Sequence, residues 1–402
     1  MQKTSHVQPS DLHGASRLAI EATLGVIDIV EALHHTITCA PGILGTAPRP
    51  PIRGIPNLVY GSIRGITRLV GDGLDAILTP VIPLLHERPS SPERDAALAA
   101  LNGVVGDHLA ASGNPLAIPM RLRRAGQALD LNTEALAAAI AQPSGKILLL
   151  VHGLCLNDRQ WRRRGHDHGA ALAAELGYTN IYLHYNTGLH ISENGRVFAN
   201  MIEALLESWP VPVQELVIVA HSMGGLVTRS ACHYGALAGH VWLRRLRKLV
   251  FLGTPHHGSP VERIGNWLNS LLGISSYTAT FERLGRIRSA GITDLRYGNL
   301  LDEDWAGRDS FAHSGDLRSA AQLPDGAQCY CIGASTSAAV GDLRDRLLGD
   351  GLVPLRSALG DHSSPSLALQ LREQWIGRDM NHMDLLDRRD VYEQLRRWLA
   401  EE

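Results

Sequence analysis

Five short apolar runs between residues 146 and 333 constrain the fold of this chain most strongly. The first is KILLLV at Lys146–Val151, and helical stretches separate it from the later runs at residues 180–185, 215–220, 247–252 and 327–333. Short runs that are mostly apolar or β-branched are typical of strands buried on both faces. Strands that alternate with helices form a parallel sheet covered by helices on both sides. The sequence therefore predicts an α/β protein with a mainly parallel sheet.

The first 90 residues have a different pattern. Residues 15–38 and 58–79 have the apolar spacing of two amphipathic helices, and a proline-rich stretch at residues 80–93 follows them. We therefore predict a helical N-terminal extension at residues 1–90 and a main domain at residues 91–402. Docking of these helices on the main domain is the favoured interpretation, and peripheral contact with a membrane surface stays open.

Composition excludes several classes of protein. The chain has 402 residues and a net charge of -2, so its overall field does not favour nucleic acid, and the basic cluster at residues 162–164 is interpreted as a solvated helix end. Its five cysteines lack paired CxxC spacing, which indicates neither a zinc site nor a disulfide framework. No secretory signal or long apolar window is visible, so a cytoplasmic protein is expected, with membrane association through residues 1–90 left open.

A serine follows the third apolar run directly, in the sequence AHSMGG at residues 220–225. Ala220 and Gly224 flank Ser222 at positions minus two and plus two, as in a G-x-S-x-G turn whose first glycine is replaced by alanine. Small flanking residues allow a strand to turn abruptly into a helix, and the helix N-terminus supplies free N–H groups. The pattern predicts a nucleophilic serine beside an anion site. An ordinary helix-capping serine is the alternative.

The loop after the first run is expected to complete that anion site. Its residues are His152, Gly153, Leu154 and Cys155. We predict an oxyanion hole made by the backbone N–H groups of Leu154 and Met223, since one donor follows the nucleophile and the other comes from this loop. His152 is interpreted as a packing residue and not as the base, and Cys155 as a small buried thiol and not as a nucleophile.

A base and an orienting acid are expected later in the chain, in the order Ser, Asp, His. Asp350, in the sequence GDGLVP, and His382, in the sequence MNHMD, are the candidates. A neutral imidazole accepts the serine proton, and a carboxylate fixes its tautomer. Rival residues near the same positions are Asp342, Asp345, Asp361 and His362.

With these residues in place, the chain resembles the lipase branch of the α/β-hydrolase family, which includes bacterial triacylglycerol lipases and PGAP-type lipid-remodelling esterases. The matching signatures occur in family order over residues 146–402: VHGL at 151–154, AHSMGG at 220–225, LGTPHHGS at 252–259, DGLVP at 350–354 and NHMD at 381–384. The resemblance implies an α/β-hydrolase fold and hydrolysis of carboxylic esters through an acyl-enzyme on Ser222. It also implies that His382 and Asp350 complete the triad, and that no cofactor takes part.

The resemblance bears on two further segments. It implies a helical lid inserted at about residues 260–325, although an extra pair of core helices would give the same apolar pattern. Some relatives bind a structural calcium through the aspartate two places after the catalytic histidine, here Asp384. Because no second acidic ligand is visible, we interpret Asp384 as a helix-capping group and predict no metal site. His256 and His257 are interpreted as loop-packing residues.

The leading hypothesis is therefore an esterase or lipase that acts on a small-molecule acyl ester or a lipid, without nucleic acid as a partner. A thioesterase or an acyltransferase would use the same triad. A catalytically silent α/β-hydrolase fold that serves as a binding or membrane-surface module is the hypothesis from another class. The sequence leaves the oligomeric state open.

Overall fold

The structure is a computed structural model, and its chain forms two compact units. Unit 1 comprises Met1–Arg94 and Leu109–Ala117, and unit 2 comprises Asp95–His108 and Ile118–Glu402. The structure describes residues 8, 10–11, 13–21, 23–24, 67–68, 72, 90–260, 289–307, 318–319, 321–337 and 349–401.

Unit 1 contains the expected N-terminal helices only in part among the described residues. Residues 10–11, 13–21, 23–24, 67–68 and 72 are helical. Within this unit the guanidinium group of Arg94 donates to both carboxylate oxygens of Asp11, from Nε at 2.8 Å and from Nη2 at 2.6 Å. Most of the stretches 15–38 and 58–79 lies outside the described residues, and the domain boundary near residue 90 stays a prediction.

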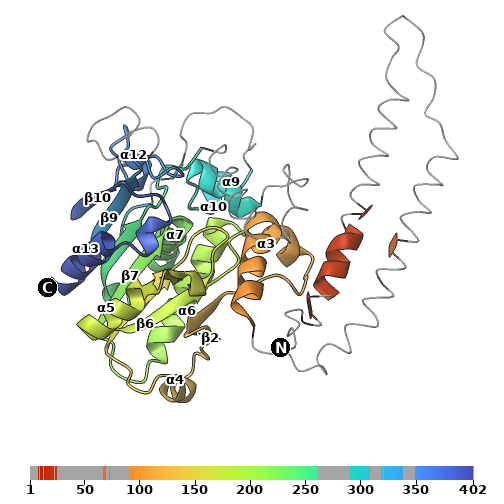
Figure 1. Cartoon of the computed structure of the whole chain (residues 1–402), viewed down its shortest axis with the longest axis horizontal. Helices are drawn as coiled ribbons and strands as arrows, with labels where there is room; N and C mark the ends of the chain where they lie inside the picture. Colours follow the sequence, from red (N-terminus) through yellow and green to blue (C-terminus); the bar gives the residue numbers. More distant parts are fainter. Residues whose placement is uncertain are drawn as a thin grey trace, which may run out of the picture. The chain divides into compact units, whose positions relative to one another are not determined.

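Unit 2 is built on an eight-stranded sheet (Figure 1). Strand β1 pairs antiparallel with β2 and with β6, and the other neighbours pair in parallel. In spatial order the strands are β10 (Glu373–Arg378), β9 (Gln328–Ser335), β8 (Leu246–Leu252), β7 (Glu215–His221), β3 (Lys146–Val151), β6 (Thr179–His184), β1 (Arg121–Arg124) and β2 (Gln127–Ala128).

Helices cover both faces of this sheet. Along β3, Leu149 packs in one apolar cluster with α6 (Ile191–Glu207) and α7 (Met223–Ala238), while Leu148 packs in a second cluster with α5 (His168–Leu176) and α13 (Arg389–Ala400). Successive side chains of a strand point to opposite faces, so burial on both faces requires an uninterrupted apolar run. This explains the sequence KILLLV.

The remaining elements surround the sheet or form its connections. Helix α3 has non-helical backbone angles at Val105, where it kinks. These elements are α3 (Pro92–Ala111), α4 (Thr133–Ala139), the hairpin of β4 (Arg162–Arg163) and β5 (His166–Asp167), α9 (Ala290–Tyr297), α10 (Asp302–Trp305), α12 (Leu355–Ala358), and the 3₁₀ turns η2 (Asp158–Trp161), η3 (Val241–Arg244) and η5 (Asp384–Leu386).

The predicted α/β architecture is confirmed, because all five apolar runs are neighbouring parallel strands of the sheet. The interpretation of residues 162–164 as a solvated helix end is borne out at Arg162, which is exposed and is the C-cap of η2, but it misses the partners of the next two residues. Arg162 and Arg163 form β4, and both Arg163 and Arg164 form ion pairs with Asp387, at 3.2 Å and 3.4 Å. The carboxylate that holds them is more than 200 residues away in the sequence, so no local pattern indicates it.

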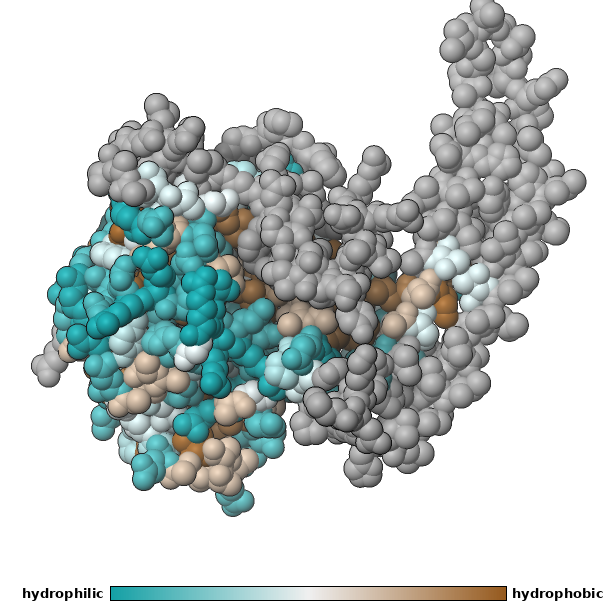
Figure 2. All heavy atoms as spheres, in the orientation of Figure 1, coloured by the Kyte–Doolittle hydropathy of each residue, from teal (hydrophilic) through white to brown (hydrophobic). Residues whose placement is uncertain are grey.

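The surface of unit 2 is mainly hydrophilic on the face that Figure 2 shows. Helix α13 contributes to it, because Arg389, Glu393 and Arg397 are exposed while Val391 and Leu395 are buried. Within the described part of the chain, no helix combines the length and the apolar character needed to cross a membrane.

Candidate active site

Ser222 lies at the sharp bend between β7, which ends at His221, and α7, which begins at Met223. Its backbone angles are φ 54° and ψ -127°, a conformation that costs a non-glycine residue of order 1–3 kcal/mol. The Ser222 N–H donates to the carbonyl oxygen of Leu252 in the neighbouring strand at 2.8 Å. The bend is therefore held by the sheet, as a nucleophile elbow requires.

The elbow needs small residues around it, as the sequence indicated. A Cβ atom on Gly224 would lie 2.6 Å from the carbonyl oxygens of Val151 and His152, which real contacts do not allow. A Cβ atom on Gly153 would lie 2.8 Å from the Cβ atom of Ser222. These close approaches bring the loop after β3 against the elbow.

The two predicted oxyanion donors lie on these two segments. Leu154 and Met223 are buried, with 2% and 0% of their surface exposed. Met223 is the first residue of α7, so its N–H has no partner within the helix. Neither amide donates to an acceptor in the ranges that the structure describes. The role of both N–H groups as oxyanion donors stays a prediction.

The structure brings His382 and Asp350 together. His382 Nδ1 lies 2.6 Å from Asp350 Oδ2, and both side chains are buried. The other carboxylate oxygen, Oδ1, accepts from the N–H groups of Leu352 at 2.9 Å and Val353 at 2.8 Å. Because a carboxylate can only accept, Nδ1 carries the proton of this hydrogen bond, and in the neutral ring Nε2 presents a lone pair.

His382 lies beside the elbow through intermediate contacts. A Cβ atom on Gly253, the residue after Leu252, would lie 3.1 Å from the Cε1 and Nδ1 atoms of His382. The ring of His221, which precedes Ser222, lies 4.6 Å from the ring of His382 between centroids. Nε2 of His382 is buried and has no hydrogen-bond partner among the described residues, so no bond joins it to the Ser222 hydroxyl.

The alternative histidine and acid candidates that the structure describes, His362 and Asp361, lie outside the Asp350–His382 pair. The ring of His362 lies 4.7 Å from that of His257, and its Nδ1 accepts from the N–H of Ser364 at 3.0 Å. The Asp361 backbone N–H donates to the carbonyl of Arg356 at 2.9 Å. Asp342 and Asp345 lie outside the described residues.

His152 and Cys155 have the environments of packing residues. His152 stacks on Tyr185 with ring centroids 4.5 Å apart, and its Nδ1 lies 3.0 Å from the Gly153 carbonyl. Burial lowers the pKa of His152 to about 3, so the ring stays neutral. Burial also raises the pKa of the Cys155 thiol well above its ordinary value, which leaves it a poor nucleophile.

Asp384 contributes to the structure of the loop that carries His382. Its carboxylate accepts from the N–H of Asn381 at 3.0 Å and forms an ion pair with Arg164 at 3.3 Å. No group of three or more potential metal ligands occurs in the described parts of the chain. His256 is buried against Phe251 with ring centroids 4.9 Å apart, and burial lowers the pKa of His256 well below its usual value. Both observations are those of a packing residue.

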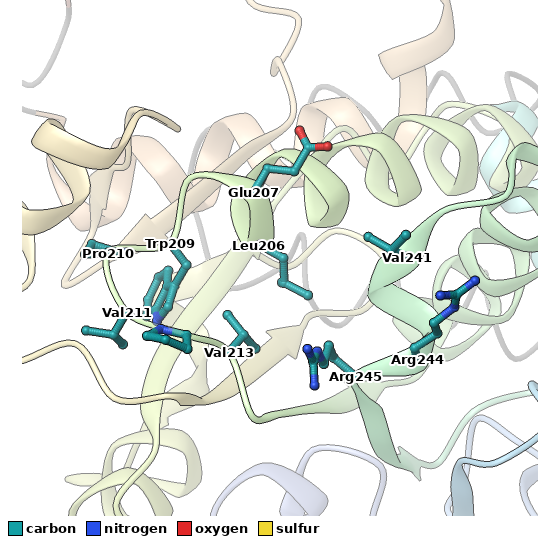
Figure 3. Close-up of a pocket in the computed structure, with 10 residues that line it drawn as sticks. Leu206, Glu207, Trp209, Pro210, Val211, Val213, Val241, Arg244 and Arg245 are labelled. Carbon is teal, nitrogen blue, oxygen red and sulfur yellow. The ribbon is translucent and has the colours of Figure 1, made fainter.

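The predicted lid at about residues 260–325 falls mostly outside the described residues, apart from Pro260 and the segments 289–307, 318–319 and 321–325 with α9 and α10. A described pocket of about 680 Å³ lies elsewhere (Figure 3). Residues before the amino ends of β7 and β8 line it, among them Trp209, Val213 and Arg245. Ser222 lies at the carboxyl end of β7, so this pocket is separate from the candidate site.

Sequence reasoning missed the residues that hold the loop of His382. His221 donates from Nε2 to the His382 carbonyl at 3.2 Å, and His168 Nε2 lies 3.2 Å from the carbonyl of Leu385. Arg163 forms an ion pair with Asp387 at 3.2 Å. These partners are far apart in the sequence, so no spacing indicates them.

Comparisons with known proteins give the following matches. A family described as "Domain of unknown function (DUF7379)" matches residues 118–295, and no curated protein matches the chain. The solved structure of mature lipase BlEst2 from Bacillus licheniformis is 17% identical, with 65% of this chain and 94% of that chain covered and a TM-score of 0.40. Aspergillus fumigatus lipase B is 12% identical, with 69% and 59% covered and a TM-score of 0.39. A thermophilic esterase from Thermogutta terrifontis is 14% identical, with 64% and 90% covered and a TM-score of 0.35.

The family description names no activity, and these structural likenesses are at low identity. The fold follows from the coordinates of the chain itself. A mostly parallel eight-stranded sheet lies between two layers of helices, and a strained serine joins a central strand to a helix. The chain's own coordinates thus have the sheet, the two helix layers and the strained strand-to-helix turn that characterise the α/β-hydrolase fold.

Proposed function

We propose that this protein is a serine hydrolase that cleaves carboxylic esters. The observation that carries the proposal is the 2.6 Å hydrogen bond between Asp350 and His382, buried beside the strained bend at Ser222. The Asp350 carboxylate fixes the orientation of the His382 ring, and Nε2 of that ring has no hydrogen-bond partner among the described residues. A serine at an elbow with such an imidazole nearby has the arrangement of a nucleophile with its base.

The proposed reaction proceeds through an acyl-enzyme. His382 Nε2 takes the proton of the Ser222 hydroxyl, whose oxygen forms a bond to the acyl carbon. The carbonyl oxygen becomes an oxyanion that accepts from the N–H groups of Leu154 and Met223. The imidazolium, stabilised by Asp350, then gives its proton to the leaving alkoxide as the ester bond breaks. Water, deprotonated by the same imidazole, releases the acid and restores Ser222.

Labelling with a fluorophosphonate tests this proposal, because the probe reacts preferentially with an activated serine. Intact-mass analysis is expected to show a single adduct per chain, and peptide mapping to place it on Ser222. Hydrolysis of p-nitrophenyl esters of graded chain length, beside matched thioesters, then identifies the acyl group and the bond that is cleaved. A chain that stays unlabelled under conditions that label a control hydrolase would support the silent binding module.

Gly153→Ala is expected to lower kcat/KM for a p-nitrophenyl ester by about 10²-fold. The new methyl group would lie 2.8 Å from the Cβ atom of Ser222 and 3.2 Å from Nδ1 of His221. The loop at residues 152–155, here called the oxyanion loop, or the elbow must therefore shift. Ester hydrolysis and thermal unfolding of the variant check this.

A matched control for that variant is Gly177→Ala at the C-terminal cap of α5. Gly177 has φ 74°, and a Cβ atom there would meet nothing within 4 Å. This change is expected to cost about 1 kcal/mol of stability and to leave the rate unchanged. Equal rates in Gly153→Ala and the wild type would contradict the close packing of the oxyanion loop on the elbow.

A further inference from the structure

The main chain of His382 is held on both sides by the other parts of the candidate site. Its N–H donates to the backbone carbonyl of Asp350 at 3.1 Å. Its carbonyl oxygen lies 3.2 Å from Nε2 of His221. The backbone of His382 is thus hydrogen-bonded to Asp350, which is the candidate acid, and to His221, which directly precedes Ser222.

His221 can reach the carbonyl oxygen of His382 because it is the last residue of β7. It is completely buried, and its ring lies 4.6 Å from the ring of His382 between centroids at an angle of 44°. A carbonyl oxygen can only accept, so Nε2 of His221 carries the proton. Burial and the neighbouring His382 lower the pKa of His221 well below its ordinary value, so the ring adds no charge beside the base.

The outer side of the same loop is bound by a separate set of groups. Arg163 pairs with Asp387, Arg164 pairs with Asp384, and His168 Nε2 lies 3.2 Å from the carbonyl of Leu385. All three partners follow His382 in the sequence. They hold the loop against the β4–β5 hairpin and the start of α5, but none of them connects it to Ser222. The hydrogen bond from His221 makes that connection.

We infer that His221 is a positioning residue that fixes the imidazole of His382 relative to Ser222. The inference rests on the proposed function, because it assigns His382 as the base. The rigid end of β7 sets the position of both Ser222 and the His221 side chain, and the His221 bond transmits that position to the backbone of His382. A displacement of about 1 Å in a reacting group can cost on the order of 10²-fold in rate.

Two substitutions separate this hydrogen bond from simple space filling. His221→Leu keeps a buried side chain of similar size and removes the donor. His221→Gln is neutral and carries an N–H donor near the position of Nε2. We expect His221→Leu to lower kcat for a p-nitrophenyl ester by about 10- to 100-fold with little change in KM. We expect His221→Gln to recover most of that loss, and intact-mass analysis to show that both variants still form the fluorophosphonate adduct.

A second measurement does not depend on turnover. The Nδ1 proton that His382 shares with Asp350 is expected to give a far-downfield proton NMR signal in the full-length protein, absent in Asp350→Ala. In His221→Leu this proton is expected to exchange faster with solvent, while His221→Gln retains the wild-type signal. Wild-type rate and exchange in His221→Leu would overturn the inference, as would equal impairment in both variants. The wild type could instead fail to form the fluorophosphonate adduct and fail to hydrolyse esters, while the proton-exchange differences between the variants are as expected. That result would reject the esterase proposal alone.

Discussion

Replacement of Ser222 with alanine is expected to abolish fluorophosphonate labelling and to lower turnover of p-nitrophenyl esters by about 10⁴- to 10⁶-fold. The change removes the oxygen that would form the acyl-enzyme and leaves His382 without a nucleophile to activate. The hydrogen bond between His382 and Asp350, at 2.6 Å, does not involve Ser222 and should persist. Intact-mass analysis and steady-state kinetics measure the two effects.

Ser222→Gly is the companion variant, because it separates loss of chemistry from loss of folding. Glycine adopts the left-handed backbone at φ 54° without the cost that serine bears, so the variant should be inactive and more stable by about 1 kcal/mol or more. Thermal unfolding measures this gain. Residual labelling of either variant at the wild-type rate would place the nucleophile at another residue.

Asp350→Asn is expected to lower kcat by about 10⁴-fold while the fold is retained. The Oδ1 atom of residue 350 accepts from the N–H groups of Leu352 and Val353, so an asparagine would keep its oxygen there. Its NH₂ group would then face Nδ1 of His382 and donate to it. This selects the tautomer with the proton on Nε2, which cannot accept the serine proton.

Asp361→Asn is the control for that variant, since Asp361 was a rival acid by sequence and lies exposed outside the Asp350–His382 pair. The control is expected to retain activity within about twofold of the wild type. Steady-state kinetics with one ester suffices for both variants. Wild-type activity in Asp350→Asn would assign the orienting carboxylate to another residue.

The sequence predicted the elements whose signals are local. KILLLV is apolar at every position facing either layer of helices, and the small residues around Ser222 mark the abrupt turn. Strand β10 lacked such a signal, because most of its positions are only partly buried and it pairs on one side with β9 alone. Strand β1, which lies next to the edge strand β2, is rich in arginine and has no apolar run at all.

The candidate site was predictable as a set of residues but not as an arrangement. The chain order of Ser222, Asp350 and His382 and the glycines around the first two identified candidates, and the structure brings Asp350 and His382 within hydrogen-bond distance. The bond from His221 to the His382 carbonyl spans 161 residues. It depends on the packing of a carboxyl-terminal loop against the end of β7, which no local pattern encodes.

The wide spacing of the candidate site along the chain also orders events during translation. Helix α7 ends at Ala238, so the elbow can leave the ribosome well before Asp350 and His382 have been added. A nascent chain at that stage holds the serine oxygen but no base to deprotonate it. On the proposed function, ester hydrolysis must therefore await synthesis of the segment around residue 382 and its docking on the end of β7.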